Sequence, residues 1–216
     1  MRRPALLLAF ALALAASLPA AEPEPLVAPD HRLAPDDPAW AELAAGLRDK
    51  PGVTANFTER RRFMFRRTPT VLKGEARVSA DHGLSLHYVE PEEQVVIMDA
   101  QGLLVRSATG DIIPPADPAA AAANAALLHL LRLELPPLAE TFELYGVHTG
   151  AGWSIALIPR AENLRRTLGQ ISVEGGGAEV RRIEFRRSAT QRVEILIDPP
   201  RAFAAFTAEE LKRFFR

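Results

Sequence analysis

The side chains that could take part in catalysis or metal binding are scattered along this chain. The five histidines, His31, His82, His87, His129 and His148, lack the spacing of metal ligands, and the sequence contains no cysteine. Neither a zinc site nor a thiol nucleophile is therefore expected. The patterns of a serine-hydrolase elbow, a zinc-protease helix and a phosphate-binding loop are absent as well. We expect no enzyme activity and no cofactor.

Three local features that resemble catalytic groups have simpler structural explanations. His87 stands beside Tyr88 in an alternating segment, where we expect it on the solvent-facing side of a strand. Glu92 and Glu93 are adjacent in a turn, so both carboxylates are expected to be solvated. The glycine triplet 175–177 precedes strand-like sequence, which favours a hairpin tip over a phosphate cradle. The chemistry that remains is the binding of apolar groups.

The apolar residues follow the period of β-strands through most of the chain. Val53, Ala55 and Phe57 share one face of a first strand. Further strands are predicted at 71–79, 84–89, 95–99, 103–107, 142–148, 152–158, 169–174, 180–187 and 192–197. The turns between neighbours are short, so the strands must pair antiparallel. Apolar and charged residues alternate at 181–187, which indicates a sheet with a wet outer face.

Three helices are predicted among these strands. The first begins at Pro38, carries Trp40 on its apolar face and ends near Asp49. The second covers 119–133 and is so rich in leucine that it must lie against an apolar surface. The third is a short C-terminal helix, which the capping-box pair Thr207 and Glu210 begins. The fold class is therefore mainly β with helices.

A basic segment follows the first strand. Five arginines at positions 60, 61, 62, 66 and 67 bracket Phe63, Met64 and Phe65, which predicts a long exposed hairpin arm leading to Pro69. Two interpretations are open for this arm. It is either an ordinary solvated face or a docking patch for a partner.

The N-terminal residues have the three-part pattern of a secretory signal peptide. Arg2 and Arg3 precede an uncharged run, and small residues with a proline follow at 17–21. The run is too short to span a bilayer comfortably, which disfavours an uncleaved anchor. We expect cleavage near Ala21, a disordered proline-rich leader at 22–38 and a single domain at 39–216. The net charge of −1 gives no indication of nucleic-acid binding.

Several short motifs together resemble one known family. They are Phe57-Thr58-Glu59-Arg60, Lys73-Gly74-Glu75-Ala76, and Glu90-Pro91-Glu92-Glu93-Gln94 ahead of Asp99-Ala100-Gln101-Gly102. In order and spacing they resemble the LolA family of periplasmic outer-membrane lipoprotein carriers. The resemblance covers roughly residues 40–199 and is carried by motifs up to residue 105.

The resemblance implies both a fold and a function. The fold is an unclosed, strongly curved antiparallel β-barrel or sheet with an α-helical lid that encloses an apolar cavity. The function is that of a monomeric periplasmic carrier for lipoprotein or another acylated lipid. Such a carrier receives its cargo from an inner-membrane exporter and passes it to an outer-membrane acceptor.

An apolar stripe at this spacing usually belongs to a filled core. The resemblance favours a cavity instead, because an open curved sheet covered by helices leaves space for a ligand. The residues then predicted to line the acyl-chain cavity are Phe57, Leu86, Tyr88, Val96, Met98, Leu104, Leu127, Leu130, Leu131, Trp153, Ile155 and Leu157.

One position departs from the family pattern. Members of the family usually have Arg-Trp upstream of the Pro-Glu-Glu-Gln turn, and this arginine hydrogen-bonds the lid helices. The matching residues here are Ser85 and Leu86, so the polar lock of the lid is missing at this position. Two other classes of function stay open. One is a periplasmic sensing or adaptor module that binds a protein partner through its arginine-rich arm, and the other is a structural module with a filled core.

Overall fold

The computed structural model describes residues 26–48, 50, 52–113, 126, 128–149, 152–203 and 205–216. The predicted signal peptide, the first part of the leader, most of the predicted helix 119–133 and Leu127 lie outside the described residues.

The described chain forms one long antiparallel sheet. Eleven strands follow each other in the order β6-β5-β4-β3-β2-β1-β11-β10-β9-β8-β7, and β12 pairs beside them with β1. In the first half the strands are β1 (Gly52–Arg62), β2 (Thr70–Ser79), β3 (Gly83–Glu90), β4 (Gln94–Asp99), β5 (Gly102–Ser107) and β6 (Ile112–Ile113). In the second half they are β7 (Phe142–Thr149), β8 (Gly152–Pro159), β9 (Gln170–Gly175), β10 (Val180–Arg186), β11 (Arg192–Ile197) and β12 (Arg201–Phe203).

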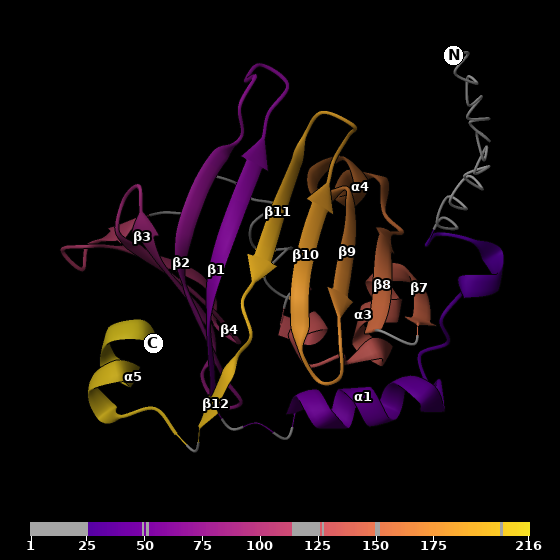
Figure 1. Ribbon diagram of the computed structural model, residues 1–216, viewed down its shortest axis with the longest axis horizontal. Coiled ribbons are helices and arrows are strands. Elements are labelled where there is room, and N and C mark those ends of the chain that lie inside the picture. The colour runs from indigo at the N-terminus through magenta and orange to yellow at the C-terminus, as the bar shows by residue number, and fades with distance from the viewer. Residues whose placement is uncertain are drawn as a thin grey trace, which may run out of the picture.

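The ends of the sheet do not meet, because β6 and β7 are its two edges. The strand direction turns strongly across the sheet, from β3 and β4 at one side to β7 and β8 at the other (Figure 1). The predicted mainly β, antiparallel and unclosed architecture is confirmed. The two short strands β6 and β12 were not predicted from the sequence.

The helices are few and short. They are η1 (Pro29–His31), α1 (Pro38–Arg48), α3 (Leu135–Thr141), α4 (Glu162–Leu168) and α5 (Ala208–Phe214), and residues 126 and 128–131 are helical too. The predicted capping box of α5 is present: Thr207 Oγ1 accepts from the Glu210 amide at 3.2 Å, and Glu210 Oε2 accepts from the Thr207 amide at 2.8 Å. Helix α4 was not predicted.

Helices cover both faces of the sheet. We call the face that carries Phe57 and Ile155 the inner face, and the face that carries Val95 and Ile97 the outer face. On the inner face α1, the helical residues 128–131 and α3 pack with the strands into the larger core. On the outer face α5 packs against β4, forming a smaller core with Phe214. Figure 1 shows α3 and α5 on opposite sides of the sheet.

Trp40 holds α1 on the inner face. Its side chain is only 3% exposed, and its ring centroid lies 4.1 Å from that of His148 and 6.4 Å from that of Trp153. The ring lies directly over Gly146, where an added Cβ would come within 2.6 Å of it. Glycine at this position of β7 therefore makes room for the indole.

The leader differs from the sequence-based expectation. We expected residues 22–38 to be disordered, but Leu33 is buried and its amide donates to the Leu144 carbonyl at 2.9 Å. Arg32 also pairs with Tyr145 as an isolated antiparallel bridge. This part of the chain therefore covers the edge strand β7, whose backbone groups would otherwise be open to another strand.

The outer face is less exposed to solvent than predicted. His87 lies on this face as expected, but it is buried, with its ring centroid 5.2 Å from that of Phe214 and Nε2 3.0 Å from Glu93 Oε1. Glu184 is also buried, because Arg182 and Arg186 both bond its carboxylate and cover it. Alternation alone assigned this face to solvent, but helix α5 and these ion pairs cover it.

Candidate functional site

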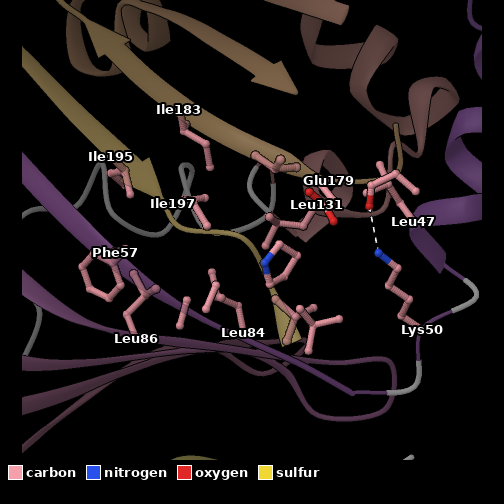
Figure 2. Close-up of a pocket in the computed structure, with 17 residues that line it drawn as sticks. Leu47, Lys50, Phe57, Leu84, Leu86, Leu131, Glu179, Ile183, Ile195 and Ile197 are labelled. Carbon is pink, nitrogen blue, oxygen red and sulfur yellow. Dashed lines mark hydrogen bonds between the residues drawn. The ribbon is translucent and has the colours of Figure 1, made fainter. Parts of the chain in front are cut away.

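An apolar pocket opens in the middle of the inner face, where β1 pairs with β11 (Figure 2). Its volume is about 120 Å³. Residues of β1, β2 and β3 line one side, residues of β10 and β11 the other, and Leu47 of α1 and Leu131 also contribute. The lining consists of Leu47, Lys50, Val53, Ala55, Phe57, Ala76, Val78, Leu84, Leu86, Leu131, Ala178, Glu179, Val180, Ile183, Ile195, Ile197 and Pro200.

The hollow arises from small side chains in the centre of the sheet. Ala55 of β1 and Ala76 of β2 stand directly opposite each other in the strand register and both line the pocket. Larger side chains surround this pair, including Leu84 and Ile183. Cross-strand partners on one face lie about 5 Å apart, so two adjacent alanines leave a depression that their larger neighbours do not fill.

Phe57 closes one end of the pocket because Gly74 makes room for its ring. Gly74 is the register partner of Phe57, and a Cβ there would lie 2.8 Å from the ring and 2.3 Å from the His87 carbonyl oxygen. Tyr88 meets Phe57 edge to face, with ring centroids 5.1 Å apart. This geometry explains the glycine in the second-strand motif Lys73-Gly74-Glu75-Ala76.

Beyond Phe57, the inner face carries a buried polar cluster of Glu59, Tyr88 and Arg61. Tyr88 Oη donates to Glu59 Oε2 at 2.6 Å, and Arg61 Nε donates to Glu59 Oε1 at 2.5 Å. The Glu59 side chain is 4% exposed, whereas that of Arg61 is 37% exposed. Burial, followed by the charge of Glu59 and the hydrogen bond to it, raises the pKa of Tyr88. The phenol therefore stays protonated and donates to a carboxylate.

Among the described residues that line the pocket, only Lys50 and Glu179 are charged. Lys50 Nζ donates to the Ala178 carbonyl at 3.1 Å, as the dashed line in Figure 2 shows. This bond joins the end of α1 to the hairpin between β9 and β10. The other described side chains of the lining are apolar, so this part of the pocket can take up hydrocarbon but offers few groups for polar recognition.

The structure brings only some of the twelve predicted lining residues to this pocket. Phe57, Leu86 and Leu131 line it. The others that are described on the inner face belong to the packed core instead: Tyr88, Val96, Met98, Leu130, Trp153, Ile155 and Leu157. Leu127 lies outside the described residues.

Leu104 and Ser85 both lie on the outer face, so the prediction that Leu104 lines the cavity is wrong. Leu104 is the register partner of Ile97 and packs with it in the core under α5. Ser85 is also paired with Ile97 and is fully buried. A side chain at position 85 points away from α1 and residues 128–131, so an arginine there would not reach a lid on the inner face.

The half of the pocket that β10 and β11 provide was not predicted from the sequence. Ile183, Ile195 and Ile197 line it, and alternation placed Ile183 on an apolar face. The missing information was the pairing of β11 with β1, which sets Ile197 opposite Phe57. No local pattern specifies a pairing between strands that are so distant in sequence.

Among known proteins, no family model matches the sequence, and no curated protein matches it. Several solved structures, however, are similar to it. Its structural neighbours include LolA superfamily proteins. One from Nitrosomonas europaea is 7% identical with a TM-score of 0.43, covering 79% of this chain and 96% of its own.

Two other solved structures are similar. A chain of the Pseudomonas aeruginosa MucA/MucB complex is 13% identical with a TM-score of 0.45, and the match covers 80% of this chain and 58% of that one. A DUF1329 family protein from Desulfovibrio piger is 9% identical with a TM-score of 0.43, covering 81% of this chain and 97% of its own. At such identities and TM-scores, function has to be inferred from the residues of this chain.

The described part of the chain has two further properties. Within it, no three side chains of the metal-binding types come together as a metal site. None of its helices has the length and apolarity needed to cross a bilayer.

Proposed function

We propose that this protein is a periplasmic carrier that shelters acyl chains of a lipoprotein, or of a related lipid, in the inner-face pocket. The cargo would come from an inner-membrane exporter and pass to an outer-membrane acceptor. One observation carries the proposal: a pocket at the centre of the sheet whose described lining residues are apolar except for Lys50 and Glu179. The motif resemblance to LolA carriers supports the same function.

The size of the pocket suggests how cargo would be held and released. Its volume of about 120 Å³ is of the order of the ~150 Å³ cavity that accommodates benzene in another protein. A segment of about six carbons would then fit, giving roughly 5 kcal/mol at ~0.8 kcal/mol per CH₂, against roughly 13 kcal/mol for a chain of about sixteen carbons. The closed pocket would bind weakly, and a whole chain would require the pocket to open.

Helix α1 is suited to act as the movable cover. Trp40 near its start is buried, whereas Leu47 near its end is only partly buried and lines the pocket. The Lys50 hydrogen bond to Ala178 is the polar contact that closes this end. Rotation about the Trp40 end would break this hydrogen bond, separate Ala44 and Leu47 from the core and widen the pocket, as a shift between two states.

Cargo is tested by lipid extraction and mass spectrometry of protein purified from its native periplasm. Co-purified acyl chains would support the carrier, whereas a protein without lipid would favour the adaptor or structural alternatives. Ile195→Trp should fill the pocket and abolish binding of a fluorescent fatty acid. Leu196→Trp is the matched control, because Leu196 is the next residue on β11 and faces the opposite side. An equal loss of fatty-acid binding in both variants would argue against this pocket as the binding site.

The cover is tested with a reversible cross-link. A Cβ on Gly46 would lie 3.1 Å from the Ala178 Cβ, close to the ~3.8 Å that a disulfide requires. The chain has no other cysteine, so Gly46→Cys with Ala178→Cys would form a single bridge between α1 and the β9–β10 hairpin. We expect the oxidised variant to take up the fatty acid much more slowly and the reduced one to recover. Unchanged uptake after oxidation would refute an α1 lid.

A further inference from the structure

The hairpin that joins β1 to β2 ends in an exposed apolar tip. Phe65 is 93% exposed and Met64 is 65% exposed, and Phe63 beside them is also exposed. The Arg66 amide donates to the Phe63 carbonyl at 3.0 Å, so Met64 and Phe65 occupy the two central positions of a tight turn. Such positions favour glycine, asparagine, aspartate or proline. The turn itself gives no reason for two large apolar side chains.

Cationic side chains surround this tip. Residues 60–69 include five arginines and no acidic residue, although the whole chain has a net charge of −1. The two arginines nearest the sheet are paired, Arg60 with Glu194 at 3.7 Å and Arg61 with Glu59 at 2.5 Å. Those nearer the tip are exposed, and the Arg66 guanidinium donates to the neutral hydroxyl of Thr70. The tip therefore presents apolar and cationic groups together.

We propose that this tip inserts into the headgroup region of a bilayer that contains anionic lipid. Met64 and Phe65 would enter the apolar boundary, while the flanking guanidinium groups would bind lipid phosphates. Basic residues next to an anionic surface add attraction that depends on salt. A bilayer with anionic lipid would therefore contact both the apolar and the cationic side chains of the tip.

The dimensions of the tip favour a lipid surface over a protein. A specific protein interface buries about 20–30 residues on each side, whereas the apolar part of this tip consists of three residues. The hairpin projects past the neighbouring strands, at the end of the sheet opposite α1 (Figure 1). It can therefore reach a flat surface before the rest of the described chain does. The inference holds whether or not the pocket binds acyl chains.

Insertion is measured with a tryptophan reporter. Trp40 and Trp153 are 3% and 4% exposed, so Phe65→Trp adds the only exposed indole of the chain's described part. With phosphatidylglycerol vesicles we expect its emission to shift to the blue and to be quenched by brominated lipid. Vesicles of phosphatidylcholine should give neither change. Absence of quenching with the anionic vesicles would overturn the proposal.

The chemistry of the tip is tested by vesicle flotation. Arg66→Gln with Arg67→Gln should weaken partitioning about 25-fold, because each basic residue contributes about fivefold. Arg181→Gln with Arg201→Gln is the control for equal charge, since both side chains are exposed on other strands. This control pair should change partitioning far less than the tip pair. An equal loss of partitioning in both pairs would show that only net charge matters and would overturn the proposal.

The apolar contribution has its own control. Phe65→Ser should weaken partitioning about tenfold, whereas Ile112→Ser, at an exposed position of β6, should leave it unchanged. The proposal would be overturned if the protein bound no vesicle and instead bound an acidic protein in a way that required Phe65. The partner of the tip would then be a protein and not a lipid surface.

Discussion

Replacing Tyr88 by phenylalanine should destabilise the protein by about 2–3 kcal/mol, through the loss of a single oxygen atom. The aromatic ring and its edge-to-face contact with Phe57 remain. What disappears is the donor to Glu59 Oε2, while Arg61 still donates to Oε1; the Glu59 side chain is only 4% exposed, so bulk water reaches the orphaned oxygen poorly. Hydrogen bonds to charged groups contribute about 1.5–3 kcal/mol, and an orphaned buried acceptor adds its desolvation cost.

Tyr145→Phe is the matched control for this substitution. Tyr145 is also buried, and its hydroxyl donates to Glu143 at 3.1 Å. The Glu143 side chain is 36% exposed, however, and two arginines lie within ion-pair distance of it. Water can therefore replace the lost donor, and we expect a change below about 1 kcal/mol. Urea unfolding at neutral pH measures both variants.

The same cluster predicts how stability changes at alkaline pH. Burial and the neighbouring Glu59 charge raise the pKa of Tyr88 in the folded protein, whereas an unfolded tyrosine titrates near ~10. Above pH ~10 the unfolded chain loses a proton that the folded chain keeps, so the free energy of unfolding falls by about 1.4 kcal/mol per pH unit. Tyr88→Phe should remove this part of the slope. The reasoning is refuted if Tyr88→Phe is as mild as Tyr145→Phe or keeps the full alkaline slope.

Three other substitutions test the contacts that shape the fold. Gly74→Ala should cost about 1–3 kcal/mol in urea unfolding, because its Cβ would collide with the Phe57 ring and with the backbone of β3. Trp40→Ala should cost about 3–5 kcal/mol and increase amide exchange throughout α1. Thr207→Ala should weaken α5 by about 1 kcal/mol in amide exchange. The hydrogen bonds of this cap also lower the pKa of Glu210, so the cap should fail as pH falls through that pKa.

Much of the sheet could be predicted from the sequence because alternation is a local property. The strands at 71–79, 84–89 and 192–197 appear in the structure with ends within one residue of those predicted. Alternation also assigns neighbouring residues to opposite faces, but it does not say which face a given set belongs to. Leu104 was placed with the inner-face residues, although register pairs it with Ile97 on the outer face. An error of one residue in such an assignment exchanges the two faces completely.

The pocket could not be predicted for a different reason. It depends on the pairing of β1 with β11, which are separated by more than a hundred residues, and on the alignment of Ala55 with Ala76 across β1 and β2. Alanine is a weak strand former, so its presence in a strand does not by itself indicate a pocket. Only the strand register places two alanines next to each other and leaves a depression between larger side chains. The volume of the site is therefore set by which small residues meet. For this reason larger side chains at positions 55 and 76 should reduce the pocket volume more directly than changes in the large apolar residues that the sequence indicated.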